Sequence, residues 1–439
     1  MPRVWQNERP ERGVSERHLA RRQVLTALGT AGGAFLAGCT RLPDTGESAG
    51  GESGDEPEGG ESAGGESNGL DRLWSAGTPT EYGTNHHRMG VVRVDGEPVV
   101  GVPRSERPDV PGCGLLAVDG DGEKRWSRDL PAEACDPHSV GDVAAGTIDG
   151  EQVFLVATIQ KEVVAYSAGT GKPRFEADLI ESVPYGAPVV SPELADGSRR
   201  IVVVDNSGNL VVARPDGSRA WTRAVDGVVY PAPVVRDVDG DGSVEVVVTT
   251  DIKSGWVLAF GIDGEPRWRT EFETGGRELS SIDREEGRDI VLSTWDGNVA
   301  AVDGASGDVR WSEPLADRGL LGDSDSERLY ATEGNGVVHA VDPEDGSVTW
   351  TVDSVATDAP ANGPVVGTNG PEGQPVVASL SYDGTLGLID PDRGNAELEH
   401  SLGTEAYTRP LLTDLTGDGS DDMLVMFGDA SVEAYTLPD

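Results

Sequence analysis

The chain has 439 residues, and its 77 acidic residues against 35 lysines and arginines give a formal net charge of −42. No basic patch follows the N-terminal segment, which argues against nucleic-acid binding. Self-repulsion of this size destabilises a compact chain unless concentrated salt screens it, so we interpret the composition as that of a halophilic protein rather than as an acidic surface for a basic partner.

Residues 1–39 are typical of an export signal. Arg21 and Arg22 precede a Gly-rich, mildly apolar stretch that is too short to span a membrane. The pair resembles a twin-arginine motif, and Leu-Ala-Gly-Cys ending at Cys39 resembles a lipobox. We therefore expect lipid modification of Cys39, export by the twin-arginine route and anchoring to the outer face of the cytoplasmic membrane.

Residues 40–69 form a Gly/Ser/Glu-rich segment. It contains no large apolar residue after Leu42, so it cannot bury enough surface to fold. A flexible coil of this length has a root-mean-square reach of roughly 30 Å. We expect a disordered tether between the lipid and the folded domain.

Residues 70–439 contain an internal repeat of about 46 residues. Its most regular feature is a glycine followed four residues later by an aromatic ring. The step recurs at Gly122–Trp126, Gly171–Phe175, Gly217–Trp221, Gly264–Trp268, Gly307–Trp311 and Gly346–Trp350, and Gly394–Leu398 keeps the spacing without the ring.

Short β-branched runs, joined by Asp-Gly and Asn-Gly turns, surround each step and predict antiparallel hairpins. The runs are apolar on both faces, as expected for small sheets packed between neighbours in a ring. The eighth unit begins at Arg409 and lacks a fourth strand, which the segment around Trp74 would supply. The sequence thus predicts an all-β fold: an eight-bladed β-propeller of four-stranded antiparallel blades, closed by the N-terminal strand.

Several repeats also place an alanine ten residues before the ring, as in Ala301–Trp311 and Ala340–Trp350. Small residues leave a slot for a flat indole. The pattern resembles the tryptophan-docking repeat of quinoprotein-type (PQQ-like) β-propellers. The resemblance implies that rings wedge between blades at Trp74, Trp126, Phe175, Trp221, Trp268, Trp311 and Trp350.

Two acidic loops have the spacing of a calcium site, with oxygen ligands at alternate positions and a glycine to turn the chain. They resemble the loops of integrin-type (FG-GAP-like) propeller repeats. The implied ligands are Asp237, Asp239, Asp241, Ser243 and Glu245 in the first loop, and Asp414, Thr416, Asp418, Ser420 and Asp422 in the second. We expect structural Ca²⁺ there, with an ordinary Asp/Gly turn as the alternative.

Cys113 and Cys135 are the two cysteines beyond the signal, and an oxidising compartment favours a disulfide between them over two buried thiols. His86 and His87 suggest a transition-metal site, but adjacent side chains point apart on most backbones, so a surface loop is expected. His138 and His339 show no ligand partners in the sequence and are expected to be structural.

The loops that enter the first strand of several blades carry tyrosines. Such loops gather at one end of a propeller channel, which makes these side chains a candidate binding surface or, alternatively, packing caps on the entry turns. The residues are Tyr82, Tyr185, Tyr230 and Tyr407, with Arg409 close by.

No nucleophile elbow, phosphate loop, zinc spacing or haem motif is present. The chain also lacks the adjacent cysteine pair of quinoprotein dehydrogenases, so bound PQQ is not expected. The resemblance instead implies a non-catalytic, lipid-anchored scaffold that binds envelope or secreted proteins. A PQQ-dependent dehydrogenase and a calcium-dependent adhesion propeller are the alternatives.

Overall fold

A computed structural model describes residues 70–438, except 78–79, 81–84, 109, 252–254, 286, 316–318, 326, 354–358 and 371–372. The described residues belong to one compact unit, Gly65–Asp439. The export signal with Arg21 and Arg22, Cys39, the tether and Tyr82 lie outside the described residues.

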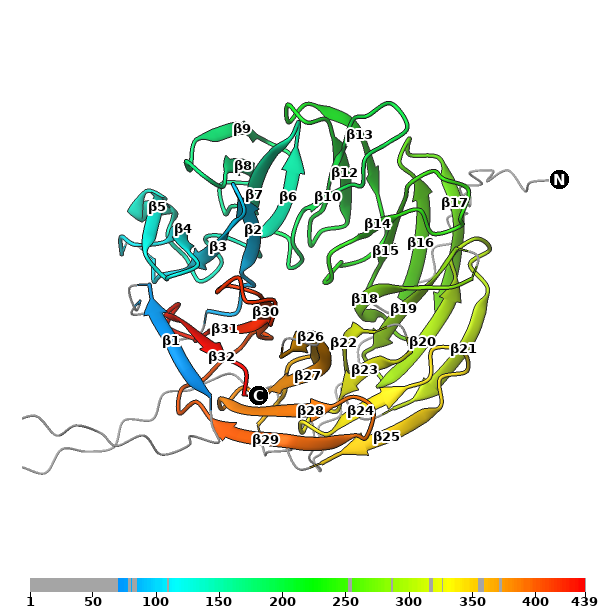
Figure 1. The fold of residues 1–439 in the computed structure, drawn as a ribbon. Helices are drawn as coiled ribbons and strands as arrows, with labels where there is room; N and C mark the ends of the chain where they lie inside the picture. The colour runs from blue at the N-terminus through cyan, green and yellow to red at the C-terminus, as the bar shows by residue number, and fades with distance from the viewer. Residues whose placement is uncertain are drawn as a thin grey trace, which may run out of the picture. The chain divides into compact units, whose positions relative to one another are not determined.

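The described chain forms eight four-stranded antiparallel sheets arranged as the blades of a ring (Figure 1). Blades 1 and 2 contain β2 (Gly90–Val94), β3 (Glu97–Arg104), β4 (Gly114–Asp119), β5 (Lys124–Asp129), β6 (Ala144–Ile148), β7 (Glu151–Ala157), β8 (Val163–Ser167) and β9 (Pro173–Ala177). Blades 3 and 4 contain β10 (Val189–Val190), β11 (Ile201–Val204), β12 (Asn209–Ala213), β13 (Arg219–Ala224), β14 (Val234–Arg236), β15 (Glu245–Thr249), β16 (Gly255–Gly261) and β17 (Pro266–Phe272).

Blades 5 and 6 contain β18 (Gly276–Asp283), β19 (Arg288–Thr294), β20 (Asn298–Asp303), β21 (Val309–Pro314), β22 (Leu320–Ser324), β23 (Leu329–Thr332), β24 (Val338–Val341) and β25 (Val348–Val352). Blades 7 and 8 contain β26 (Val365–Asn369), β27 (Gln374–Leu380), β28 (Thr385–Asp390), β29 (Asn395–Ser401), β30 (Leu411–Thr413), β31 (Asp422–Met426), β32 (Val432–Thr436) and the N-terminal β1 (Asp71–Ala76). The predicted eight-bladed fold is therefore confirmed. A 3₁₀ turn, η1 (Ala132–Ala134), lies between blades 1 and 2.

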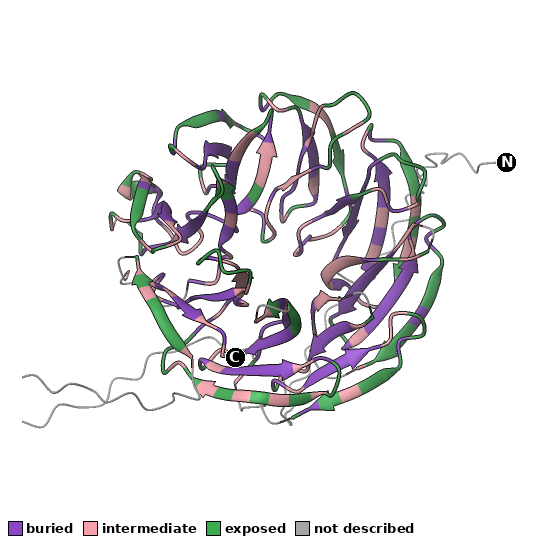
Figure 2. Ribbon diagram, viewed as in Figure 1, coloured by how far each residue is buried: buried purple, intermediate pink, exposed green. Residues whose placement is uncertain are grey.

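The second and third strands of the blades are largely buried on both faces, whereas the outer strands are mostly exposed or half-buried (Figure 2). The core consists of layers between neighbouring blades. In one such layer, Val247 and Ala259 of blade 4 pack with Ile290 and Leu292 of blade 5. Burial from both sides explains why these strands are apolar throughout rather than alternating.

The ring closes between its two ends. β1 is the outer strand of the eighth sheet and pairs antiparallel with β32, with Trp74 opposite Ala434 (Figure 1). This closure covers the edge that β32 would otherwise leave unpaired.

The recurring glycine and indole meet across blade boundaries. In blade 5, Ala301 lies directly opposite Trp311 on the neighbouring strand. The indole of Trp311 then lies against Gly346 of blade 6, where a Cβ would come within 2.6 Å of the ring, and Gly346 has a φ of +78°. Each glycine therefore accommodates the ring of the preceding blade and also supplies the left-handed turn.

Each docked indole also donates its Nε1–H to a carbonyl oxygen of the next blade. The pairs are Trp74–Gly120, Trp126–Ala168, Trp221–Ile262, Trp268–Gly304, Trp311–Pro343 and Trp350–Pro391, at 2.7–2.9 Å. Phe175 contacts Gly217 in the same way but has no N–H to donate. Leu388 and Leu398 face each other in blade 7, where the small-plus-ring pair is absent.

Candidate functional site

One end of the central channel holds a cavity of about 600 Å³. All eight blades contribute to its wall, mostly through the residues just before or at the start of their first strands. These lining residues include Arg88, Asp142, Tyr185, Tyr230, Arg277, Leu320, Asn362 and Tyr407. Convergence of eight entry loops on one concavity makes it the candidate ligand-binding site.

Aromatic rings cover one part of the wall. Tyr185 stacks on Tyr230 at 4.9 Å between ring centroids, and Trp295 meets Tyr230 edge-on at 5.5 Å. The guanidinium of Arg277 lies 5.0 Å from the centre of the Trp295 ring. Tyr185 and Trp295 are 43% and 42% exposed, so this cluster faces solvent with rings already held in place.

A second aromatic pair, Tyr382 and Tyr407, lies edge to face at 5.4 Å on the same wall. Burial, together with the hydrogen bond to Glu405, raises the pKa of Tyr407 to about 12. Burial also raises the pKa of Tyr382. Both phenols are protonated at neutral pH, and the Tyr407 hydroxyl donates its proton to Glu405.

The cationic side chains at the cavity are held by carboxylates. Arg88 lies 3.5 Å from Glu278 and 3.9 Å from Asp142, and Arg409 lies 2.7 Å from Asp323. Burial alone would lower the pKa of Arg88, but the surrounding carboxylates raise it overall. The cavity thus presents positioned guanidinium groups within a strongly acidic chain.

The structure brings the predicted Tyr185, Tyr230, Tyr407 and Arg409 together around this cavity. Sequence reasoning missed Trp295 and Tyr382. Both immediately precede an Asp-Gly turn that joins the second and third strands of a blade, in Trp-Asp-Gly and Tyr-Asp-Gly. That repeated context was a usable signal, because hairpin turns of several blades open at this end of the channel.

The first acidic loop joins β14 to β15 and gathers carboxylates. One oxygen each from Asp237, Asp239 and Glu245 lies within 4.8 Å of the other two. Glu245 is 1% exposed; its Oε2 accepts the Val238 N–H at 3.1 Å, whereas its Oε1 has no hydrogen-bond partner. Burial, reinforced by the charges of Asp239 and Asp241, raises the pKa of Glu245 to about 7. An unpaired buried carboxylate oxygen beside two more carboxylates fits a hard cation.

The second acidic loop joins β30 to β31 and is arranged differently. Asp422 Oδ2 accepts the backbone N–H groups of Leu415 and Thr416, and Asp414 accepts those of Gly417 and Gly419. The Arg93 guanidinium lies 3.9 Å from Asp414 Oδ2. Within the described part of this loop, no three carboxylates come together as in the first loop.

Cys113 and Cys135 form a disulfide across 22 residues of sequence. It ties the start of β4 in blade 1 to the loop that leads toward blade 2. The bond therefore holds the segment that carries His138.

The expected surface loop at His86 and His87 is wrong for His87, which is 2% exposed. The structure also gathers His86, His87 and His138, with ring nitrogens within 4.8 Å of one another. Burial lowers the pKa of His138, and the neighbouring His87 lowers it further. His339 instead bonds Glu333 and Thr351 inside blade 6, a structural arrangement.

No helix in the described part of the chain has the length and hydropathy needed to cross a bilayer. No curated protein matches the sequence. A PQQ-like family model described as outer membrane protein assembly factor BamB matches three overlapping stretches, residues 113–284, 187–320 and 253–423.

Solved structures with the same fold include both a BamB and quinoprotein enzymes. BamB from Moraxella catarrhalis is 16% identical, with a TM-score of 0.58 over 84% of this chain and 98% of that one. A europium-containing methanol dehydrogenase is 13% identical, with a TM-score of 0.58 over 84% and 93%. The quinohemoprotein alcohol dehydrogenase ADHIIG from Pseudomonas putida HK5 is 13% identical, with a TM-score of 0.59 over 84% and 76%.

At such identities the structural likeness concerns the fold alone. The family match is broader evidence, because its three stretches together cover most of the propeller. The chain is a PQQ-like β-propeller and belongs to the family whose model is described as outer membrane protein assembly factor BamB.

Proposed function

We propose that the protein is a non-catalytic binding scaffold whose channel-end cavity receives segments of other envelope or secreted proteins. The observation that carries this proposal is the cluster of Tyr185, Tyr230 and Trp295, which is prearranged and yet exposed. Membership of a family described by an assembly factor supports it.

Aromatic and arginine side chains are enriched among the few residues that carry most of the binding energy at protein interfaces. The cavity combines both kinds. Arg277 lies over Trp295, and Arg88 and Arg409 stand at the same wall. This surface suits extended segments that offer apolar or aromatic side chains together with a carboxylate.

The proposed site of action is the outer face of the cytoplasmic membrane. The support for it is the sequence alone: Arg21 and Arg22 as an export signal, Cys39 as the lipid attachment site, and a tether before Leu70. A flexible tether would let the cavity reach partners near the membrane surface.

Photo-crosslinking in native membranes tests the proposal. A photoreactive phenylalanine analogue at Tyr185 is expected to capture protein partners, whereas the same analogue at Val348, which is 44% exposed on the outer strand β25, is not. Trp295→Ala should weaken capture from Tyr185 by about tenfold, since truncating an interface anchor typically costs 1–2 kcal/mol or more. Equal capture from Tyr185 and Val348 would show that the cavity is not the binding surface.

A PQQ-dependent dehydrogenase is the second candidate, because the cavity is large enough for a small cofactor and presents guanidinium groups suited to an anionic quinone. An absorbance scan and mass spectrometry of native protein purified in concentrated salt separate the two. A stoichiometric quinone would favour the dehydrogenase over the scaffold function. Absence of a quinone, together with partners captured from Tyr185, would favour the scaffold function.

We further propose a structural Ca²⁺ ion at the first acidic loop, held by Asp237, Asp239 and Glu245. Chelation is expected to lower the midpoint of thermal unfolding by about 5 °C, because a saturating ligand contributes about 2.7 kcal/mol at 100 times its Kd. Glu245→Gln should unfold at the chelated midpoint and show no response to chelator. Asp422→Asn in the second loop is the matched control and should retain the response.

The same experiment addresses the adhesion alternative. If Ca²⁺ only pins the β14–β15 hairpin, chelation lowers stability but leaves partner capture from Tyr185 intact. Loss of capture at a temperature where the chelated protein stays folded would favour calcium-dependent adhesion instead.

A further inference from the structure

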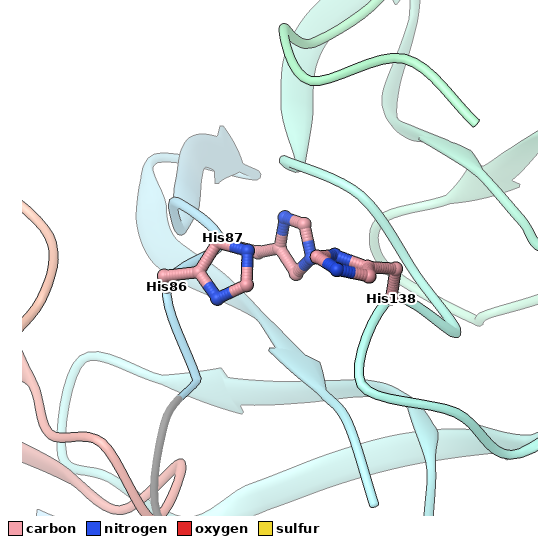
Figure 3. Close-up of side chains that lie close together, drawn as sticks. All are labelled: His86, His87 and His138. Atoms are coloured by element: carbon pink, nitrogen blue, oxygen red, sulfur yellow. The ribbon is translucent and has the colours of Figure 1, made fainter. Parts of the chain in front are cut away.

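Three histidines from two separate loops meet beside the cavity (Figure 3). His86 and His87 precede β2 of blade 1, and His138 precedes β6 of blade 2. The ring centroids lie 4.5 Å apart for His86–His87, 5.0 Å for His86–His138 and 5.7 Å for His87–His138. One ring nitrogen from each residue lies within 4.8 Å of the other two.

Within the cluster, one buried nitrogen of His87 has no hydrogen-bond partner. The His87 side chain is 3% exposed, and the unpaired atom is its Nε2. A buried polar atom left unsatisfied is costly, and such atoms in a native structure call for an explanation. A bound cation at Nε2 would supply the missing interaction.

The other nitrogen of His87 faces a carboxylate. Its Nδ1 lies 3.4 Å from Asp142 Oδ1, which also accepts the Arg88 backbone N–H at 3.0 Å. A carboxylate behind a histidine fixes the ring orientation and makes the opposite nitrogen a better metal ligand. Histidines that bind a metal through one ring nitrogen usually donate the N–H of the other nitrogen to such a carboxylate.

Both loops are held in position. The Asn85 side chain donates to the Pro103 carbonyl at 2.8 Å and accepts the His87 N–H at 3.3 Å. On the other loop, Asp136 Oδ1 accepts the His138 N–H at 3.0 Å, and the Cys113–Cys135 disulfide anchors the chain three residues earlier. The loops that carry the three histidines are therefore both fixed by contacts with the rest of the fold.

We propose that His86, His87 and His138 bind one divalent transition-metal ion, with Zn²⁺ as the expected metal. Imidazole ligands favour Zn²⁺ and its neighbours over Ca²⁺ or Mg²⁺. Zinc–nitrogen bonds of about 2.0–2.1 Å place tetrahedral ligands roughly 3.3 Å apart, so side-chain adjustments of about an ångström complete the site.

Three histidines leave the fourth position of a tetrahedral zinc ion open. His86 and His87 also line the channel-end cavity. The open position therefore takes water or a carboxylate or imidazole group of a molecule in the cavity. The metal site does not depend on the scaffold function, since the ion binds whether or not a protein segment enters.

The test uses the full-length, tag-free chain stripped of metal, with Ca²⁺ in large excess so that the carboxylate loops are saturated. Co²⁺ is titrated first, because its visible absorption reports the ligand geometry, and Zn²⁺ is then added in competition. We expect one Co²⁺ per chain, displaced by Zn²⁺. His87→Ala, His86→Asn and His138→Asn should each weaken binding at least about 100-fold, whereas the control His400→Asn should not.

Two further readouts separate ligation from folding. His86 and His138 are only partly buried, so their variants should keep the wild-type melting temperature without metal while losing the rise that Zn²⁺ gives the wild type. Asp142→Asn should weaken the metal about 10- to 100-fold with an unchanged cobalt spectrum, as expected of a positioning residue. Binding that is absent, or that survives in the His86 and His138 variants, would overturn the proposal.

Discussion

Trp126→Ala is expected to lower the free energy of unfolding by about 4 kcal/mol, near the upper end of what a single core truncation costs. Trp126 is 7% exposed and lies between blades 1 and 2. Its Nε1–H donates to the Ala168 carbonyl at 2.7 Å, and its ring fills the space over Gly171. The substitution therefore opens a cavity between two blades and leaves a carbonyl without its donor.

Trp295→Ala is the matched control, because it removes the same side chain from the cavity wall rather than from a blade boundary. Trp295 is 42% exposed, so its loss should change stability by less than about 1 kcal/mol while weakening partner capture. Denaturant unfolding followed by circular dichroism measures both variants. Equal losses of stability in the two would contradict the docking role of Trp126.

Removal of β1 is expected to have the other large effect. A chain that begins at Gly77 loses the strand that pairs with β32 and also loses Trp74, whose indole lies over Gly122 and donates to the Gly120 carbonyl. We expect the free energy of unfolding to fall by at least about 3 kcal/mol. The exposed edge of β32 should also promote self-association, because unpaired strand edges recruit other strands.

Sedimentation velocity and thermal unfolding test this against two comparison chains. A chain that begins at Leu70 lacks the tether but keeps β1, and should remain monomeric with the stability of the parent. Trp74→Ala keeps the strand and removes only the docked ring, so it should lose about 2–3 kcal/mol, less than Trp126→Ala because Trp74 is only partly buried. A monomeric, fully stable chain from Gly77 would show that ring closure contributes little.

Local sequence was sufficient for most of the fold because seven blades are each built from four consecutive strands, and only the eighth takes in a distant strand, β1. The Gly-x-x-x-aromatic step specifies a turn and an aromatic side chain at fixed spacing. Its repetition along the chain predicts the circular arrangement of blades. The sequence did not show that Gly346 accommodates Trp311 of the preceding blade rather than Trp350 of its own. That assignment depends on how neighbouring blades are offset.

The candidate sites were predictable to different degrees. Tyr185 and Tyr230 stood out because each precedes the first strand of a blade, a position that the fold places at one end of the channel. The acidic loops were visible from their spacing, and Glu245 and Asp422 are both buried. The loops differ because Glu245 Oε1 has no hydrogen-bond partner and the Glu245 carboxylate lies near Asp237 and Asp239, whereas Asp422 Oδ2 accepts two backbone N–H groups. Such contacts depend on how each loop folds, which the spacing of ligands does not report.

The sequence by itself determined the repeat, the number of blades and the closure of the ring, because these follow from patterns that recur within each unit of the chain. The tertiary structure alone decided that His138 shares one site with His86 and His87. The physical reason is that these side chains come from different blades. Their meeting is set by the curvature of the ring and by side-chain direction, and neither leaves a trace in local sequence spacing.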